Sequence, residues 1–174
     1  MKILITGGAG LIGSNLAKLL ISKNYEVFIA DNLWRGKLDN LRVNNEYIIN
    51  LETHFYNVDL TNYESCLIVT KKIDLIIHLA DIVAGINYVF NNELSLFRSN
   101  ILINSNTLNA AIINKVPKIL YVGTACSYPL ERQSELNMPA LKEDDVYPAN
   151  PESSYGWSKL MGEYEMELAN KMGK

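Results

Sequence analysis

Short apolar runs alternate with longer amphipathic stretches along most of this chain. The first run, KILIT at Lys2–Thr6, is apolar throughout and therefore predicts a buried strand. Ile12, Leu16, Leu19 and Leu20 follow it at helical spacing and predict an amphipathic helix. Four more runs of strand type follow, at Glu26–Asp31, His54–Asp59, Asp74–Leu79 and Lys118–Gly123.

Helical patterns separate these predicted strands. We expect a short helix ending near Val69, a long helix from Leu94 to Ile113 and a last helix from about Ser154 to Met172. The polar segment DNLWRGKLDNLRVNNE predicts a loop, as does Ser127 to Pro151, which holds four of the five prolines. Apolar strands that alternate with helices are typical of a parallel sheet with helices on both faces. The sequence therefore predicts a doubly wound, Rossmann-type α/β fold of three layers, α/β/α, formed by residues 1–174 as one domain.

Composition narrows the class of protein without changing the fold. The chain has 174 residues, of which 48% are hydrophobic and 20% charged, and its net charge is −3. This balance gives no reason to expect nucleic acid or an anionic membrane as a partner. Its two cysteines are far apart and predict no disulfide framework and no metal site, so we expect a cytoplasmic location. Glycines interrupt the first apolar run, which argues against a secretion signal, and no run approaches the roughly 18–20 residues of a membrane span.

A glycine-rich turn joins the first predicted strand to the first helix. Gly7, Gly10 and Gly13 have the spacing GxxGxxG, a weak signal alone that gains meaning between a strand and an amphipathic helix. Gly7 permits a tight turn, Gly10 allows a pyrophosphate to approach the backbone, and Gly13 lets the helix pack closely. The helix N-terminus then offers N–H groups to the phosphates, so the turn predicts a dinucleotide site.

Asp31 ends the second predicted strand and decides which dinucleotide is expected. A carboxylate at this place accepts hydrogen bonds from the adenosine ribose and repels a 2′-phosphate, which favours NAD. Arg35 and Lys37 follow closely and could bind that phosphate, so NADP remains a less favoured alternative.

The last predicted helix opens with SSYGWSKLMGE. Tyr155 and Lys159 are four residues apart and therefore share one helix face. An ammonium beside a phenol favours the phenolate and lowers the tyrosine pKa from about 10. Such a tyrosine can take a proton from an alcohol while hydride leaves for a nicotinamide.

With these motifs together, the chain resembles the extended short-chain dehydrogenase/reductase family, the NAD-dependent sugar-nucleotide epimerases and dehydratases. The resemblance covers essentially all 174 residues. Its motifs, in chain order, are TGGAGLIG, DNL at Asp31–Leu33, VDL at Val58–Leu60, HLA at His78–Ala80, NILINSNTLNAA at Asn100–Ala111, and YGWSK.

The resemblance implies roles for residues that spacing alone does not assign. Thr124 completes a catalytic Ser/Thr-Tyr-Lys set with Tyr155 and Lys159. The implied contacts with the cofactor are Gly7, Gly10, Leu11, Ile12, Gly13, Asp31, Asn32, Leu33, Asp59, Leu60, Leu79, Ala80, Asn100, Tyr155 and Lys159. The family's HLAA reads HLAD here, with Asp81, and its GT reads Ile103-Asn104, which we expect to alter local packing more than chemistry.

Histidines and the first cysteine receive structural interpretations. His78 lies in an apolar strand and is interpreted as structural rather than as a general base. His54 begins a strand and has no evident partner in the sequence. Cys66 lies in the helical pattern ESCLIV and is interpreted as a core residue.

Cys126, in the segment TACSYP, narrows the predicted reaction. Dehydratases of the family carry an Asp-Glu pair after the threonine, and Ala125-Cys126 stand here instead. TACSYP is similar to the loop of GDP-mannose 3,5-epimerases and GDP-fucose synthases. Once carbon 4 of a sugar is a ketone, the protons on carbons 3 and 5 become acidic, and a thiol with a pKa of about 8.5 suits their removal or return. A buried, inert cysteine is the alternative, since cysteine is often that.

The family continues past the YxxxK helix with a sixth strand and a substrate domain. We therefore expect this chain to be a fragment that binds NAD without turnover, the second acid/base and most contacts with a GDP- or UDP-sugar coming from the remainder. A UDP-sugar 4-epimerase, a UDP-glucuronate decarboxylase and a non-catalytic dinucleotide-binding module stay open. Members often dimerise through the helices matching the Asn100 and Tyr155 regions, so a homodimer is possible.

Overall fold

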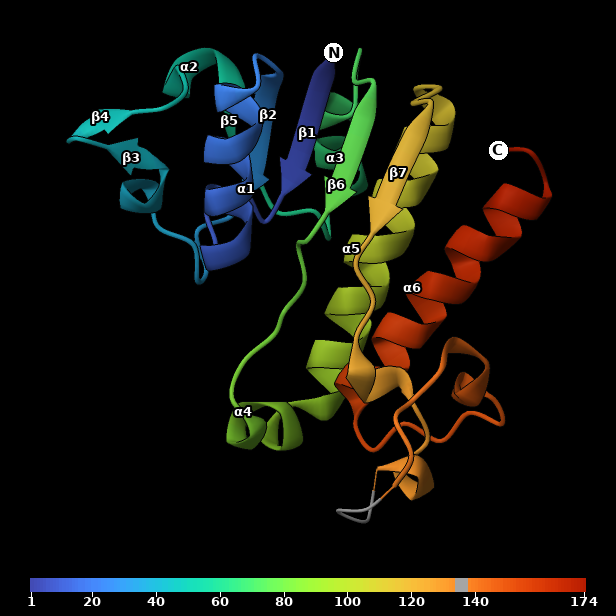
Figure 1. Ribbon diagram of the computed structural model, residues 1–174. Coiled ribbons are helices and arrows are strands. Elements are labelled where there is room, and N and C mark those ends of the chain that lie inside the picture. Colours follow the sequence, from blue (N-terminus) through green and yellow to red (C-terminus); the bar gives the residue numbers. More distant parts are fainter. Residues whose placement is uncertain (134–137) are drawn as a thin grey trace. The chain divides into compact units, whose positions relative to one another are not determined.

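The computed structural model describes residues 1–133 and 138–174, and the predicted loop from Ser127 to Pro151 lies partly outside them. The chain forms two compact units (Figure 1). Unit 1 consists of residues 1–81 and 106–122, and unit 2 of residues 82–105 and 123–174. Each unit is described by itself below.

Unit 1 is built on a parallel sheet of five strands in the order β5-β2-β1-β6-β7 within the described chain. The strands are β1 (Lys2–Thr6), β2 (Glu26–Asp31), β5 (Phe55–Asn57), β6 (Leu75–His78) and β7 (Lys118–Tyr121). Every pairing is parallel, and β1 lies at the centre, with Ile5 opposite Ile29 on one side and Ile77 on the other. This order confirms the predicted doubly wound sheet.

Helices cover both faces of this sheet. Helices α1 (Leu11–Ser22) and α3 (Tyr63–Val69) lie on opposite faces (Figure 1). The part of α5 (Glu93–Ile113) that belongs to unit 1 lies with α3, where Thr107 meets Cys66. Ile3, Leu4 and Ile5 of β1 are at most 1% exposed because both faces of their strand are covered. The predicted three layers are therefore confirmed.

The face that α1 buries agrees only in part with the predicted one, since Leu16 and Leu20 pack against the core as expected. Ile12 is 69% exposed and Leu19 is 52% exposed, although their spacing placed them on the core face. The buried residues of α1 are instead the small ones, Gly13, Ser14 and Ala17. These small residues let the helix approach the sheet closely, and Leu16 and Leu20 pack beside them against the core.

Short elements account for most other differences from the sequence prediction. His54 does not begin a strand, because it ends the one-turn helix α2 (Leu51–His54). The expected loop after β2 contains the 3-10 helix η1 (Leu38–Leu41) and a hairpin of β3 (Arg42–Val43) and β4 (Glu46–Tyr47). Its turn residues Asn44 and Asn45 have φ of 51° and 67°, the left-handed values of a two-residue hairpin turn.

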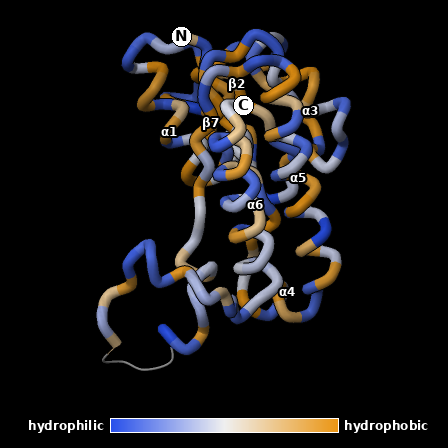
Figure 2. Tube along the Cα trace, turned by 90° about the vertical axis from the view of Figure 1, so that its right-hand side faces the viewer, coloured by the Kyte–Doolittle hydropathy of each residue, from blue (hydrophilic) through white to orange (hydrophobic). Residues whose placement is uncertain are grey.

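Unit 2 is mainly helical. It contains α4 (Ile86–Asn91), the first part of α5, the 3-10 turns η2 (Ala125–Ser127), η3 (Leu130–Arg132) and η4 (Glu143–Val146), and α6 (Ser154–Lys171). The Ser105 hydroxyl on α5 donates to Glu165 on α6 at 2.7 Å. Hydrophobic and hydrophilic positions are interspersed along α6 (Figure 2), as in a helix with one buried face. Within the described residues, no helix combines the length and apolarity that a membrane span requires.

Candidate functional site

The turn after β1 has the backbone that the glycine pattern predicted. Gly7 has φ of +68°, and a β-carbon there would lie 3.0 Å from the Ala80 nitrogen. Its own N–H donates to the Ala30 carbonyl at 2.8 Å, which ties the turn to β2. Gly10 precedes α1 as its N-cap, and a β-carbon there would come within 3.1 Å of the Gly7 oxygen. A side chain at either glycine would therefore crowd the turn.

Two further glycines close the packing of this turn. A β-carbon at Gly13 would lie 2.5 Å from the Gly7 oxygen, so α1 touches the turn directly, in line with the close packing predicted for it. Gly8 was given no role from the sequence, yet a β-carbon there would lie 2.6 Å from Cγ2 of Ile29. A glycine is needed at this position because Ile29 of β2 leaves no room for a side chain. Nothing in the sequence indicates this need except the doubled glycine, Gly7-Gly8.

The N-terminus of α1 suits an anionic group. Leu11 and Ile12 in its first turn are 79% and 69% exposed. Within the described structure, no side chain caps this helix and its first turn holds no acidic residue. The first N–H groups therefore face neither a competing acceptor from a cap nor a repelling carboxylate, which fits the pyrophosphate of a dinucleotide.

Asp31 lies at the carboxyl end of β2 and is 9% exposed. Its Oδ2 accepts from the Ala9 N–H at 3.0 Å, and its Oδ1 accepts from the Leu33 N–H at 2.8 Å. A carboxylate has about four acceptor positions, so each oxygen keeps one for a ribose hydroxyl. A β-carbon at Gly36 would lie 2.8 Å from Oδ1, which identifies Gly36 as a neighbour that sequence reasoning missed.

The other predicted cofactor residues of unit 1 follow neighbouring strands at the same edge. Exposed Asp59 follows β5, and its Oδ1 accepts from the Thr61 N–H and hydroxyl, both at 2.8 Å, while Leu60 is 4% exposed. Leu79 and Ala80 follow β6. Because the strands are parallel, their carboxyl ends meet at one edge, where ligands of open α/β sheets bind. Unit 1 therefore brings these predicted residues together.

The structural interpretations of Cys66 and His78 agree with the structure. Cys66 is fully buried, and burial raises the pKa of its thiol to about 11. His78 is also fully buried, and its Nδ1 lies 2.7 Å from the Thr6 hydroxyl. His54, in contrast, does have partners: its ring stacks on Phe28 at 4.6 Å between centroids, and its Nε2 lies 3.8 Å from Glu26.

The residues predicted for proton transfer lie in unit 2. Tyr155 and Lys159 both lie in α6, so the predicted helix and spacing are present. Lys159 is 4% exposed and Tyr155 is half-buried. The helix begins at a capped end, since the Ser153 hydroxyl accepts from the Gly156 N–H at 3.2 Å. This cap fixes the turn that carries Tyr155.

Thr124 and Cys126 belong to one short turn beside α6. The Thr124 hydroxyl accepts from the Cys126 N–H at 3.2 Å and so caps η2. The carbonyl of Cys126 lies so close to Gly156 that a β-carbon there would collide with it. The Cys126 side chain is exposed, so the alternative of a buried filler is wrong. Sequence reasoning missed Gly156, because nothing but its contact with η2 requires a glycine in this helix.

Asn100 on α5 is engaged in the scaffold of unit 2. Its Oδ1 accepts from the Ile82 N–H at 2.7 Å, and its Nδ2 donates to the Ile82 carbonyl at 3.2 Å and to Ser158 at 3.4 Å. The residue is fully buried. Its predicted contact with the cofactor stays a prediction, while its amide holds the segment after Asp81. Ile103 and Asn104, which depart from the family pattern, are buried on the same helix.

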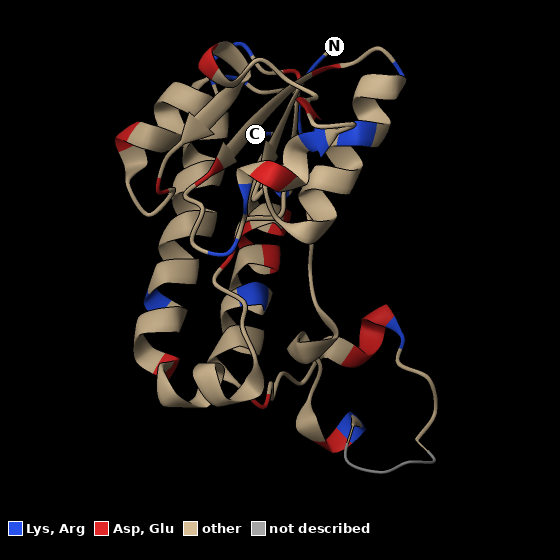
Figure 3. Ribbon diagram, turned by 90° about the vertical axis from the view of Figure 1, so that its left-hand side faces the viewer, with Lys and Arg blue, Asp and Glu red and all other residues tan. Residues whose placement is uncertain are grey.

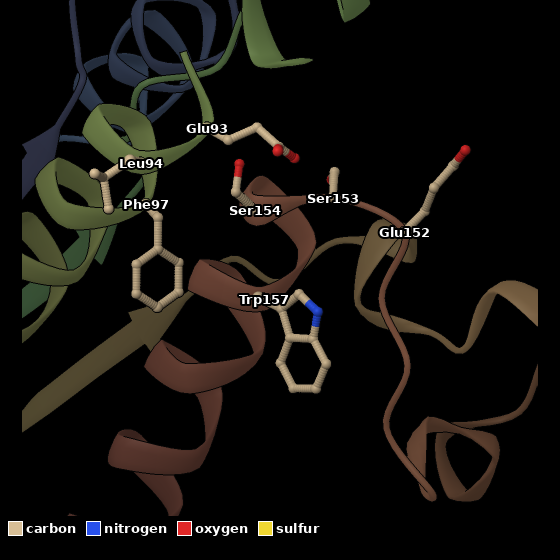
Figure 4. A pocket seen from close by; sticks show the side chains of 7 residues that line it. All are labelled: Glu93, Leu94, Phe97, Glu152, Ser153, Ser154 and Trp157. Atoms are coloured by element: carbon tan, nitrogen blue, oxygen red, sulfur yellow. The ribbon is translucent and has the colours of Figure 1, made fainter. Parts of the chain in front are cut away.

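A hollow of about 470 Å³ lies elsewhere in unit 2. It is lined by Glu93, Leu94, Phe97, Glu152, Ser153, Ser154 and Trp157. Figure 4 shows it between the first turns of α5 and α6, with the Phe97 and Trp157 rings on its sides. None of the predicted cofactor or catalytic residues lines it, so we do not identify it with the candidate site.

A Rossmann-type sheet with a glycine turn and an acidic residue after β2, together with a Tyr-Lys helix, defines a dinucleotide-dependent enzyme of the oxidoreductase type. Comparison with known proteins makes this specific. The family model of the NAD dependent epimerase/dehydratase family matches residues 3–174. The chain therefore belongs to that family, and NAD is the family's cofactor, as predicted.

Individual relatives agree with this assignment. GDP-mannose 3,5-epimerase 1 of Oryza sativa subsp. indica is 35% identical over 165 residues, covering 94% of this chain and 41% of the rice protein. The Thermus thermophilus UDP-glucose 4-epimerase in complex with NAD has a TM-score of 0.81 at 26% identity, covering 99% of this chain and 51% of that one. The Thermotoga maritima UDP-glucose 4-epimerase with UDP-glucose has a TM-score of 0.82 at 26% identity, covering 99% and 52%. The chain thus spans about half the length of these relatives.

Proposed function

We propose that this chain is the NAD-binding part of a sugar-nucleotide epimerase that acts through a transient 4-keto sugar, with Cys126 as an acid/base. The observation that carries the proposal is the exposed thiol of Cys126 on the turn that Thr124 caps, packed against the helix of Tyr155 and Lys159. A threonine, a tyrosine and a lysine in this arrangement have no use in a protein that only binds a dinucleotide. They therefore support an enzyme over a non-catalytic binding module.

The residues of unit 1 hold the cofactor in this proposal. Gly7, Gly10 and the first turn of α1 receive the pyrophosphate, and Asp31 receives the ribose hydroxyls. When bound, NAD supplies reversible removal of hydride from carbon 4 of the sugar. The exposed Arg35 and Lys37 leave NADP as the less favoured alternative, because the carboxylate of Asp31 opposes a 2′-phosphate.

The residues of unit 2 move protons. Tyr155 accepts the proton of the carbon-4 hydroxyl at its phenolic oxygen, and the ammonium of Lys159 stabilises the phenolate that does so. The hydroxyl of Thr124 accepts from Cys126 N–H and still has its own proton to donate to the same substrate oxygen. These three residues would act alike in a 3,5-epimerase and a 4-epimerase.

Cys126 distinguishes the reaction. Its thiol removes or returns a proton at carbon 3 or carbon 5 beside the ketone, and it is exposed as this role requires. Inversion needs a second acid/base on the opposite face of the sugar, to which we assign no residue of this chain. The rice GDP-mannose 3,5-epimerase, at 35% identity, supports a GDP-sugar as substrate.

A UDP-sugar 4-epimerase is the second candidate. Its support is the likeness to two UDP-glucose 4-epimerases, with TM-scores of 0.81 and 0.82, and the fold alone serves either reaction. A UDP-glucuronate decarboxylase stays open on the same scaffold. Assays of the full-length protein against GDP-mannose, UDP-glucose and UDP-glucuronate separate the three. We expect conversion of GDP-mannose, and conversion of UDP-glucose alone would replace our proposal with the second candidate.

The 174-residue chain itself is proposed to bind NAD without epimerising a sugar nucleotide, since its relatives are about twice as long. Titration calorimetry on the purified chain tests the binding of NAD, and a product assay tests the absence of turnover. NAD binding without turnover is the expected result. Turnover by this chain would contradict the proposed inactivity, and failure to bind NAD would contradict the proposed binding.

We also propose a homodimer. On α6 the apolar side chains of Met161, Tyr164 and Leu168 lie on one face and are 36%, 46% and 41% exposed. The proposed occupant of this face is the same helix of a second copy. In the view of Figure 3, acidic and basic residues of the described chain are interspersed, so the charges favour no nucleic acid. A cytoplasmic location stays a prediction from the cysteine count.

Sedimentation of the full-length protein tests the dimer. We expect a dimer that becomes a monomer in Tyr164→Arg and persists in Lys71→Glu, a charge change at an exposed residue outside α6. A monomeric parent protein would rule this interface out.

A further inference from the structure

The hydroxyl of Thr6, just before the glycine-rich turn, lies within hydrogen-bond distance of three groups from the end of β6 and the chain after it. Thr6 is the last residue of β1 and is fully buried. Its Oγ1 accepts from the Ala80 N–H at 3.1 Å and from the Leu79 N–H, also at 3.1 Å, and the Leu79 N–H is shared with the Thr6 carbonyl at 3.2 Å. The same oxygen lies 2.7 Å from Nδ1 of His78. We call these four residues the Thr6 network.

The count of donors and acceptors fixes the direction of the third contact. A threonine hydroxyl has one proton and two lone pairs. The two amide N–H groups take both lone pairs, so the hydroxyl proton points to Nδ1 of His78. His78 must then accept at Nδ1, and an imidazole that accepts there is neutral, with its proton on Nε2. The ring also stacks on Tyr121 of β7, with 5.9 Å between centroids.

The network ends at the predicted wall of the dinucleotide site. Gly7 follows Thr6 directly, and its missing β-carbon would lie 3.0 Å from the Ala80 nitrogen and 3.2 Å from the Leu79 carbonyl carbon. The chain leaving β6 therefore lies against the turn leaving β1, with the Thr6 hydroxyl bound to both of its amides. Leu79 and Ala80 are half-exposed at this place, while Thr6 and His78 are hidden beneath.

From this geometry we infer that Thr6 and His78 are positioning residues for NAD: the Thr6 hydroxyl, held by neutral His78, fixes the Leu79–Ala80 peptide against Gly7 and so sets the shape of the dinucleotide site. Neither side chain touches the cofactor in this account. The inference rests on the proposed binding of NAD through Gly7, Leu79 and Ala80. It gives a physical reason for a buried histidine at a strand end, because no apolar residue accepts the threonine proton.

The test compares Thr6→Val with a matched change elsewhere in unit 1. Valine keeps the shape of threonine and removes the hydroxyl. Thr70→Val is the control, because Thr70 is equally buried and its hydroxyl donates to the Cys66 carbonyl and accepts from Asn114, away from the glycine turn. Thr6→Ser restores the hydroxyl. For each variant of the full-length protein, amide hydrogen exchange, NAD affinity by calorimetry and the unfolding midpoint are measured.

We expect Thr6→Val to speed exchange at the Ala80 amide and to weaken NAD binding, each roughly tenfold, as for the loss of one buried hydrogen bond. The Leu79 amide should change less, because it also donates to the Thr6 carbonyl. Thr6→Ser should restore both Ala80 exchange and NAD binding to within about twofold. Thr70→Val should lower the unfolding midpoint and leave NAD affinity unchanged. Equal effects of Thr6→Val and Thr70→Val on NAD affinity, after allowance for stability, would overturn the inference.

Two readouts keep the inference separate from the proposed function. Nitrogen-15 shifts of the parent protein report the His78 tautomer without any substitution, and a proton on Nδ1 would overturn the network even if Thr6→Val did not fold. If the parent protein failed to bind NAD, the proposed function would fall, and so would the positioning role inferred here. In a parent protein that binds NAD, a Thr6→Val variant that folds and binds equally well would defeat the inference alone.

Discussion

At the scale of single residues, the two cysteines show how environment separates one thiol from the other. Cys66 is a buried residue of α3, and its sulfur lies 3.9 Å from the Thr107 hydroxyl of α5 and donates to the Leu60 carbonyl at 3.3 Å. Cys126 is exposed on the η2 turn. Burial disfavours the thiolate at Cys66, whereas the thiol of Cys126 is open to solvent.

The raised pKa of Cys66 predicts a pH dependence of stability. Burial raises this pKa from 9.0 to about 11, against a smaller lowering by the Thr107 hydrogen bond. Below pH 9 folded and unfolded chains both keep the proton, and between pH 9 and 11 only the unfolded chain loses it. The free energy of unfolding should therefore fall over that window by up to ~3 kcal/mol from this group.

Urea unfolding from about pH 8 to about pH 11 measures this dependence. Other groups titrate there too, so the comparison is with Cys66→Ala, which should lose ~3 kcal/mol less across the window. Cys126→Ala is the control and should follow the parent chain. Parallel curves for all three proteins would show that Cys66 is not protected by burial.

At the scale of elements, the contact of η2 with α6 holds the predicted catalytic residues of unit 2 together. Thr124 and Cys126 lie on η2 and its cap, and Tyr155 and Lys159 lie on α6. Gly156 makes the close approach possible because it leaves room for the Cys126 carbonyl. The Ser127 hydroxyl, also buried, reaches the Gly156 carbonyl at 3.5 Å.

Gly156→Ala should therefore destabilise the protein, against the usual trend for a helix. An alanine in a helix interior normally stabilises by ~1 kcal/mol relative to glycine. Here the added methyl meets the Cys126 carbonyl, and we expect a net loss of ~1–3 kcal/mol, as for overpacking. Urea unfolding measures the loss, and the rate of Cys126 alkylation reports displacement of η2.

Gly123→Ala is the matched control for this change. A β-carbon there would have an ordinary contact of 3.5 Å with Glu163, so it should leave both stability and alkylation nearly unchanged. A more stable Gly156→Ala variant with unchanged Cys126 alkylation would mean that η2 and α6 are not coupled.

The sequence predicts long secondary-structure elements better than short ones. The runs at Lys2–Thr6 and Glu26–Asp31 coincide with β1 and β2, and the long helix begins one residue before Leu94, because such elements span enough residues for a pattern to show. The hairpin of β3 and β4 was missed, since a strand of two residues leaves no periodicity.

Some residues of the candidate site could likewise be predicted from the sequence, and others could not. Gly7, Asp31 and Tyr155 could be found because they lie at fixed spacings within motifs. Gly36 and Gly156 could not, because each is required only by a neighbour outside its own element, the Asp31 carboxylate in one case and the Cys126 carbonyl in the other. Spacing finds residues that touch a ligand more readily than residues that support them.

At the scale of the whole molecule, the chain divides the proposed chemistry between its two units. Unit 1 holds the predicted dinucleotide residues at the carboxyl edge of its sheet, and unit 2 holds the predicted proton-transfer residues on η2 and α6. The residues proposed for the redox step are those that the resemblance to the family implied. The proposed role that goes beyond this redox step is the exchange of a sugar proton by the thiol of Cys126.

Solvent deuterium exchange measures that claim directly. The full-length protein with NAD and GDP-mannose in D₂O should incorporate deuterium at carbon 3 or carbon 5, detected by NMR. Cys126→Ser should keep NAD affinity and lose this exchange roughly a hundredfold or more, as for a missing acid/base, whereas Cys66→Ala should retain it. Deuterium incorporation by Cys126→Ser at the parent rate would contradict this role of the thiol.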